Sequence, residues 1–133
     1  MMSSAARIGL LAGVFAMLAG GPVLAGAAPE AARGERLFMQ CAACHSMQPT
    51  PGGLGPPLAG IVGRAAAATP GYPYSAALSG AGLQWDEATL NRWLERPNQL
   101  VPGTKMIFAG ISNPADRLAL IAYLKAAAGA AAK

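Results

Sequence analysis

Two cysteines and a histidine form the stretch with the clearest chemistry, Cys41-Ala42-Ala43-Cys44-His45. They are the only two cysteines and the only histidine in the 133 residues. On a helix, residues three apart share a face, so Cys41 and Cys44 can present both sulfurs to the two vinyl groups of one porphyrin. His45 can then supply an imidazole to one side of the iron. The C-x-x-C-H spacing therefore predicts one haem c, attached covalently through both cysteines.

Two other interpretations of these residues are a disulfide or thioredoxin-like redox pair, and a zinc site. A thioredoxin-like C-x-x-C is expected within a βαβ pattern, and no such pattern is present. Zinc takes about four ligands, so carboxylates would have to complete a site that has only three Cys and His side chains. Both interpretations are weaker than the haem interpretation.

A haem with one protein ligand binds small molecules, whereas one with both axial positions filled mainly passes electrons. A second histidine is ruled out within this chain, and methionine is the next candidate. Met39 and Met47 lie within two residues of the haem motif and cannot easily reach the opposite side of the iron. Met106 lies on a distant loop rich in Gly and Pro and can reach it.

The first 27 residues have the plan of a secretory signal peptide, in which a short basic start precedes an apolar stretch and then small residues. Cleavage fits after Ala25 or after Ala27. The alternative is an uncleaved membrane anchor, but glycines and Pro22 interrupt the apolar stretch, and a membrane span needs about 18 clean apolar residues. We therefore expect a cleaved leader, 1–27, and one domain, 28–133.

Charge and composition exclude two classes of partner. The formal net charge of +4 falls to +3 without Arg7 of the leader, and the lysines are only Lys105, Lys125 and Lys133. No basic stripe is present, so nucleic-acid binding is not supported. The hydrophobic content of 53% is inflated by the leader and by alanine runs, so membrane contact is expected only through partner complexes. We expect a monomer.

Three helices joined by long loops are expected after the leader. The first covers 31–45 and delivers the haem motif. The second starts at the N-cap Asp86 and runs to about residue 95, before Pro97. The third starts at the N-cap Asn113, with Pro114 in its first position.

The remaining segments, 46–82 and 98–111, are rich in Gly and Pro and are expected to be loops. Residues 126–133 are expected to fray. No β alternation of useful length is present, so the sequence predicts an all-α fold.

The sequence resembles class I cytochromes c, and is close to mitochondrial cytochrome c and its soluble bacterial relatives. The resemblance covers nearly all of 33–125. It rests on six motifs in order: 41–45, 55–64, 70–75, 82–85, 102–111 and 120–125.

The resemblance implies a small cytochrome c fold whose N- and C-terminal helices cross and whose long loops wrap around one covalently bound haem. It implies that His45 and Met106 are the iron ligands, and that the carbonyl of Pro56 accepts the Nδ1–H of the haem histidine. Gly34 is expected to let the crossing helices approach closely. Donor side chains around the haem propionates are expected at Arg64, Tyr74, Trp85 and Thr104.

The function implied is a soluble one-electron carrier of the periplasm, where haem c is attached in this family, and not an enzyme. Its expected donor is a quinol-oxidising complex or dehydrogenase, and its expected acceptor is an oxidase or photosynthetic reaction centre. Two alternatives are the cytochrome subunit of a dehydrogenase complex, and a haem peroxidase or gas sensor with an open sixth site.

Three positions depart from the family pattern. Trp93 stands where tyrosine is common, and Leu78 stands where mitochondrial relatives have an asparagine linked to a buried water. The lysine ring around the haem edge is nearly absent, and only Lys105 matches it clearly. Association with a redox partner is therefore expected to slow by well under about tenfold between low and physiological salt.

Overall fold

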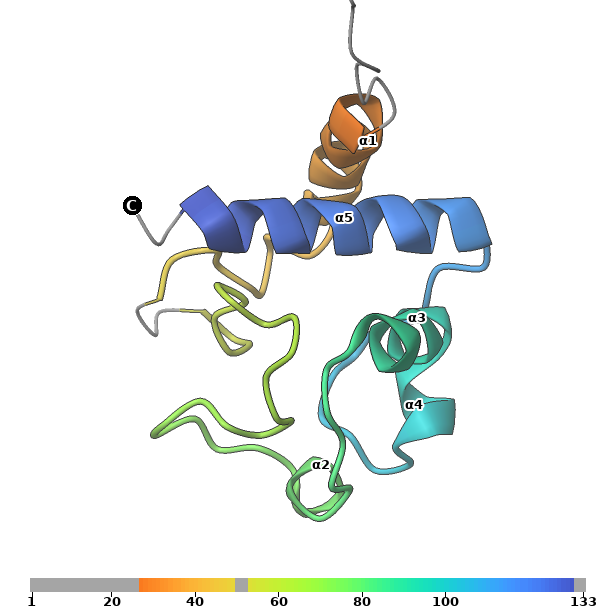
Figure 1. The fold of residues 1–133 in the computed structure, drawn as a ribbon. Coiled ribbons are helices and arrows are strands. Elements are labelled where there is room, and N and C mark those ends of the chain that lie inside the picture. Colours follow the sequence, from red (N-terminus) through yellow and green to blue (C-terminus); the bar gives the residue numbers. More distant parts are fainter. Residues whose placement is uncertain (1–26, 50–52, 131–133) are drawn as a thin grey trace, which may run out of the picture.

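The computed structural model describes residues 27–49 and 53–130, without the side chains of the first two and last two of them. The predicted leader lies outside these residues apart from Ala27. The helices are α1 (Ala27–Phe38), α2 (Ala76–Ser79), α3 (Glu87–Glu95), α4 (Pro97–Leu100) and α5 (Pro114–Ala130) (Figure 1). Over the described residues, extended pairing is limited to an isolated bridge between Ala65 and Gln84. The predicted all-α class is confirmed.

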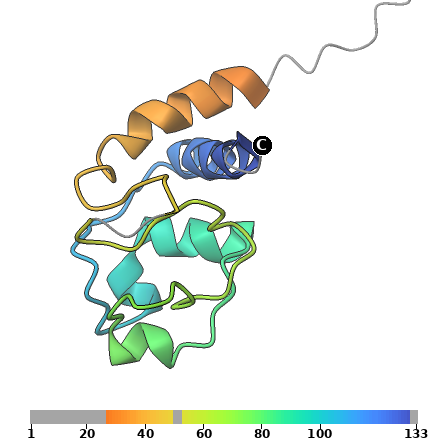
Figure 2. The ribbon, with the colours of Figure 1, turned by 90° about the vertical axis from the view of Figure 1, so that its left-hand side faces the viewer.

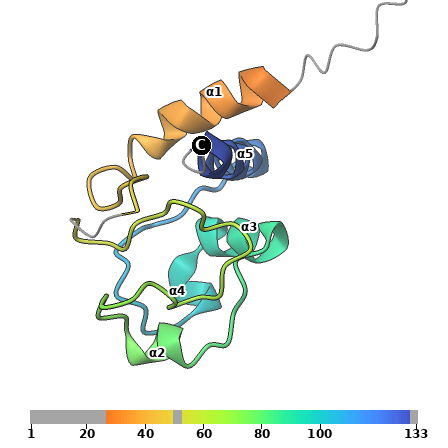
Figure 3. The same cartoon turned by 60° about the vertical axis from the view of Figure 1, so that its left-hand side comes forward.

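The first and last helices cross, as predicted (Figures 1 and 2). At the crossing, a Cβ added to Gly34 would overlap the carbonyl oxygen of Ala119. The rings of Phe38 and Tyr123 meet beside it, with centroids 5.4 Å apart. Leu120 is 1% exposed at the centre of α5. This pair covers the loops and short helices that lie below it in Figure 3.

The predicted first helix is wrong at its C-terminal end, because α1 stops at Phe38 and the haem motif follows in turns. The amides of Met39 and Gln40 donate to carbonyls three residues back, at 3.3 and 3.4 Å, which is the tighter 3₁₀ pattern. Bonds of the i→i−4 type occur again from Ala42 N to Phe38 O at 3.0 Å and from His45 N to Cys41 O at 2.9 Å. The two cysteines thus remain about one turn apart although the helix has ended.

The two later helices begin where the sequence predicts. The Asp86 carboxylate accepts from Thr89 N at 2.7 Å and caps α3, and the Asn113 side chain accepts from Ala115 N at 2.9 Å at the start of α5. Pro97 ends α3 but also begins α4, so the predicted loop 98–111 is wrong over 98–100. Proline suits a first helical position because its missing N–H would be unpaired there anyway.

The predicted fraying from residue 126 is also wrong as far as Ala130, because α5 continues to that residue. Its last turns are mostly alanine, the residue with the highest helix propensity. Over 27–49 and 53–130, no helix has the length and apolar character needed to cross a membrane.

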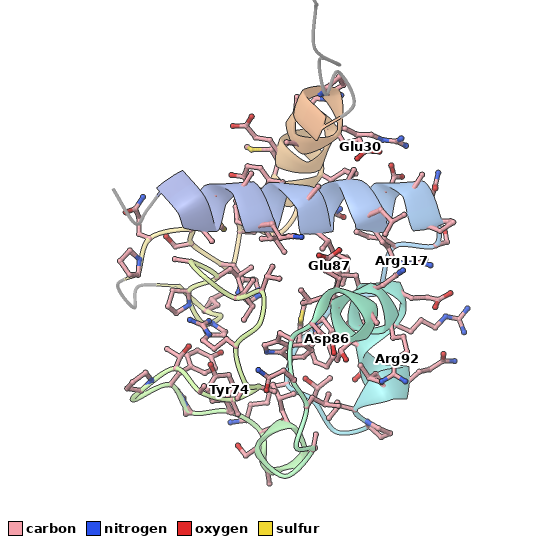
Figure 4. The ribbon with its side chains drawn as sticks, in the orientation of Figure 1. Glu30, Tyr74, Asp86, Glu87, Arg92 and Arg117 are labelled. Carbon is pink, nitrogen blue, oxygen red and sulfur yellow. The ribbon has the colours of Figure 1, made fainter. Side chains whose placement is uncertain are left out.

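The buried side chain of Arg117 joins α5 to α3 (Figure 4). Its Nε donates to Asn91 Oδ1 at 2.5 Å, and its Nη1 donates to the carbonyls of Ile111 and Ser112 at 2.7 and 2.9 Å. These bonds give the buried guanidinium of Arg117 its hydrogen-bond acceptors. They also fix the end of the loop that carries Met106.

Candidate functional site

A largely apolar cavity of about 430 Å³ lies between the end of α1, the long loops, α3 and α5. This volume is typical of a site for a small molecule or cofactor. Eight of the nine predicted site residues line the cavity, which are Cys41, Cys44, His45, Pro56, Tyr74, Trp85, Thr104 and Met106. The loops and helices therefore bring together residues up to 65 positions apart in the sequence.

The imidazole of His45 is oriented by a backbone carbonyl. Its Nδ1 lies 2.8 Å from Pro56 O, and because a carbonyl can only accept, Nδ1 carries the hydrogen. The neutral ring then has its lone pair on Nε2, which is the arrangement of a metal-binding histidine with an outer hydrogen bond. His45 is thus prepared to bind iron through Nε2.

The loop around Pro56 is bonded directly to the haem motif. Gly55 N donates to Cys44 O and Leu58 N donates to Ser46 O, both at 2.8 Å. A Cβ added to Gly55 would lie 2.5 Å from Cε1 of the imidazole, so only glycine fits. Gly55 belongs to the motif 55–64, but its contact with the ring could not be predicted from spacing.

The two cysteines lie at the cavity as separate thiols, Cys41 partly buried and Cys44 exposed. Burial raises the pKa of the Cys41 thiol, and the neighbouring Cys44 adds to this rise. Among the described residues, no three His, Cys, Asp or Glu side chains gather as a metal site, so the zinc interpretation finds no support.

Met106 is the only methionine among the residues that line the cavity. Met39 is 70% exposed, and Met47 packs against the core without reaching the cavity. The local loop is shaped by Gly103, with φ of +90°, and by a hydrogen bond from Met106 N to Thr104 Oγ1 at 3.3 Å. The cavity thus contains one imidazole and one thioether.

Three of the four predicted propionate donors line the cavity. The Tyr74 hydroxyl accepts from Thr69 N at 3.3 Å, and the ring of Trp85 packs against Trp93 with centroids 5.1 Å apart. Arg64 is placed elsewhere, because it is not in the cavity wall and its guanidinium donates to the carbonyls of Pro57 and Ala59 at 3.1 and 3.2 Å. In this position Arg64 supports the loop that holds His45.

Tyr72 and Lys105 hold the loops together, a role that their positions in the sequence do not predict. The Tyr72 hydroxyl donates to Leu54 O at 2.7 Å, and Lys105 Nζ donates to Pro73 O at 3.0 Å. The rings of Tyr72 and Tyr74 also meet, with centroids 4.7 Å apart. Segment 72–74 is therefore tied both to the loop beside His45 and to the loop of Met106. The only signal in the sequence is a pair of tyrosines that flank Pro73.

The cavity fits a haem in size, in its apolar walls and in its donor atoms. Two thiols lie at its edge, an imidazole has Nε2 available, and a thioether lines the same space. A porphyrin needs apolar walls and iron ligands of this kind.

Comparison with known proteins supports this assignment. Residues 31–128 match the Cytochrome c family. The chain is 48% identical over 99 residues to cytochrome c2 of Rhodomicrobium vannielii, which covers 74% of this chain and 79% of that protein. It is 42% identical over 125 residues to cytochrome c-554 of Methylosinus trichosporium, covering 92% of each.

Among solved structures, cytochrome cH from Methylobacterium extorquens superposes with a TM-score of 0.69 at 48% identity. The match covers 72% of this chain and 97% of that one. With the C-x-x-C-H spacing, these similarities establish one haem c, held covalently through Cys41 and Cys44, in a protein that carries electrons and is not an enzyme. The chain belongs to the cytochrome c family.

Proposed function

We propose that His45 Nε2 and Met106 Sδ are the two axial ligands of the haem iron, and that the protein is a periplasmic one-electron carrier. The observation that supports this most strongly is the shared cavity, in which a pre-oriented imidazole and a single methionine are brought together. The haem supplies an iron that exchanges one electron. With His45 and Met106 both bound, the iron would have no open position, which favours electron transfer over the binding of small molecules.

The other predicted site residues are proposed to control the surroundings of the haem. Pro56 fixes the ring of His45, while Tyr74, Trp85 and Thr104 offer hydroxyl and indole donors to the propionates. Arg64 is proposed to act on the propionate side through the loop that it supports, since its guanidinium is bonded to carbonyls of that loop.

The periplasmic location rests on the leader predicted over 1–27. N-terminal sequencing of the protein from a periplasmic fraction is expected to start at Gly26 or Ala28. A protein that retains residues 1–25 and fractionates with the membrane would show that the leader is an anchor.

The proposed partners are redox complexes, with a quinol-oxidising complex or dehydrogenase as donor and an oxidase or photosynthetic reaction centre as acceptor. The similarity to bacterial cytochromes c2 and cH supports a carrier between such complexes. Purification in a fixed ratio with a dehydrogenase would instead make the chain a subunit of that enzyme.

A redox titration combined with carbon monoxide binding tests the proposed function. The wild-type protein is expected to show one reversible one-electron couple, and its reduced form should bind carbon monoxide slowly because both axial positions are filled. Met106→Ala should bind carbon monoxide rapidly, whereas Met47→Ala should behave as wild type. Rapid binding by the wild type would indicate an open sixth site and contradict the proposal.

A further inference from the structure

The loop that carries Met106 is held by backbone hydrogen bonds only at its two ends. At the first end the amide of Thr104 closes a turn, and at the second end Ile111 N donates to Leu94 O at 2.8 Å. Over 105–110, no backbone amide or carbonyl is hydrogen-bonded to another backbone group of the described residues. The position of Met106 therefore depends on how firmly the two ends of the loop are fixed.

The second end of the loop lies against the last turn of α3. A Cβ added to Gly110 would overlap the carbonyl oxygen of Glu95, so the two backbones are in direct contact there. The same helix lines the haem cavity with the side chains of Trp93 and Leu94. Part of the cavity wall is therefore also the surface on which the Met106 loop ends.

Arg117 holds this end in place from the side of α5 (Figure 4). Its side chain is 9% exposed, and its Nη1 donates to Ile111 O at 2.7 Å and to Ser112 O at 2.9 Å. Its Nε donates to Asn91 Oδ1 at 2.5 Å, whereas the exposed Glu95 carboxylate lies 3.9 Å from Nη1. Because the guanidinium is planar and rigid, the bond to Asn91 fixes the direction in which its other nitrogens point.

We propose that Arg117, oriented by Asn91, is a positioning residue for the Met106 thioether. By holding two consecutive carbonyls at the end of the loop, Arg117 limits how far the sulfur can move away from the iron. The bonds of this one buried side chain connect α5, α3 and the loop, and Ile111 follows Met106 by five residues. The inference rests on the proposed function, in which Met106 is an iron ligand.

Displacement of the thioether by imidazole measures this restraint. When the ferric holoprotein is mixed with excess imidazole at neutral pH, the observed rate reaches a plateau set by loss of the sulfur from the iron, and the weak far-red absorption band of sulfur-ligated iron disappears. Asn91→Leu is expected to raise the plateau rate at least about fivefold, because a hydrogen bond to a charged group is lost. Asn91→Asp keeps an acceptor oxygen for Arg117 and should stay within about twofold of wild type.

Arg117→Lys is a second variant, and it keeps the positive charge. Lysine lacks the planar fork by which one side chain reaches Asn91 and both carbonyls, so the plateau rate should again rise at least about fivefold. Hydrogen exchange of the Ile111 amide provides a readout without any added ligand. Exchange should quicken at least about threefold in Asn91→Leu and in Arg117→Lys, because the bond from Ile111 N to Leu94 O opens more often.

Lys125→Met is the matched control, since Lys125 is the other cation of α5 that is bonded to α3, through Glu87, at an exposed site outside the cavity lining. Its plateau rate should stay within about twofold of wild type. Gly34→Ala is a second control, because it alters the crossing of α1 and α5 and does not touch the loop. It should lower the global stability and still leave the plateau rate within about twofold of wild type.

Wild-type plateau rates in Asn91→Leu and Arg117→Lys would overturn the positioning role while leaving the electron-carrier function intact. An equal acceleration in the two control variants would also overturn it, because displacement would then follow the overall stability of the protein. Absence of the far-red band in the wild type would count against the proposed function instead, so the two failures can be told apart.

Discussion

His45 is fixed from two sides by the backbone of a single loop. Pro56 O accepts from its Nδ1, and Gly55 passes so close to the ring that a methyl group would collide with it. The bond from Gly55 N to Cys44 O then connects the loop to the haem motif itself. These contacts within the protein therefore orient the imidazole without any contribution from iron.

Gly55→Ala is expected to destabilise the oxidised holoprotein by about 1–3 kcal/mol, the usual cost of forcing extra atoms into a packed site. The added Cβ would lie 2.5 Å from Cε1 of His45, well inside ordinary contact. Guanidinium unfolding measures the change. Gly80→Ala is the control, because its Cβ would meet only Ala76 O at 3.2 Å and should cost less. Equal stability of the two variants would contradict the tight packing around His45.

Ala67 has a left-handed backbone with φ of 58°, which disfavours every residue except glycine. That conformation costs about 1–2 kcal/mol for an L-residue, while glycine costs about 0.5–1 kcal/mol in backbone entropy. Ala67→Gly should therefore stabilise the protein, by about 0.5 kcal/mol. Ala68→Gly, at a neighbour without positive φ, should instead destabilise it. Thermal unfolding of both variants checks the sign, and destabilisation by Ala67→Gly would refute the strained backbone.

Among the elements, the crossing of α1 and α5 is the contact that closes the domain over its loops. The two backbones meet where Gly34 faces the Ala119 carbonyl, and the next two side chains of α5, Leu120 and Ile121, are buried. Glycine in a helix interior is unfavourable by itself, so its presence here is explained by the close approach.

Gly34→Ala tests the crossing because two effects of opposite sign compete. Alanine gains about 1 kcal/mol of helix propensity over glycine. Overlap with the Ala119 carbonyl is expected to cost more, so that the net free energy of unfolding falls by about 1–2 kcal/mol. Denaturant titration provides the measurement, with Glu35→Ala on the exposed face of α1 as the control. A net gain in stability would show that the helices do not approach this closely.

The N-terminus of α3 provides a pH-dependent contribution to stability. Hydrogen bonds from Thr89 hold the pKa of the Asp86 carboxyl below its usual value. A depressed pKa means that this contribution is complete above the unfolded pKa of about 3.9, and is lost as the pH falls through the lower folded value. Asp86→Asn should therefore be less stable than wild type at pH 7, and the gap should narrow below about pH 4. A gap that stays constant in acid unfolding would contradict the charged cap.

At the scale of the whole molecule, the parts that the sequence predicts are those with local causes. The starts of α3 and α5 follow from Asp86 and Asn113, and the haem motif follows from three side chains at fixed spacing. The parts that it misses depend on distant partners. The Tyr72–Leu54 bond and the Arg117–Asn91 bond each join segments that no local pattern connects.

The long loops are consistent with a fold built around a rigid cofactor. They supply most of the cavity wall and are joined to one another by side-chain bonds from Tyr72, Lys105 and Arg64. Loops of this length are otherwise uncommon inside a compact domain. A covalently bound haem gives them an apolar body to pack against.

The central proposal is that His45 and Met106 would hold the haem iron from both sides and leave it no open position. The optical spectrum of the oxidised holoprotein tests it most directly, through the weak far-red band that arises when a thioether sulfur ligates the iron. We predict that the band is present in the wild type and in Met47→Ala, and absent in Met106→Ala. Absence of the band in the wild type, or its persistence in Met106→Ala, would contradict the account.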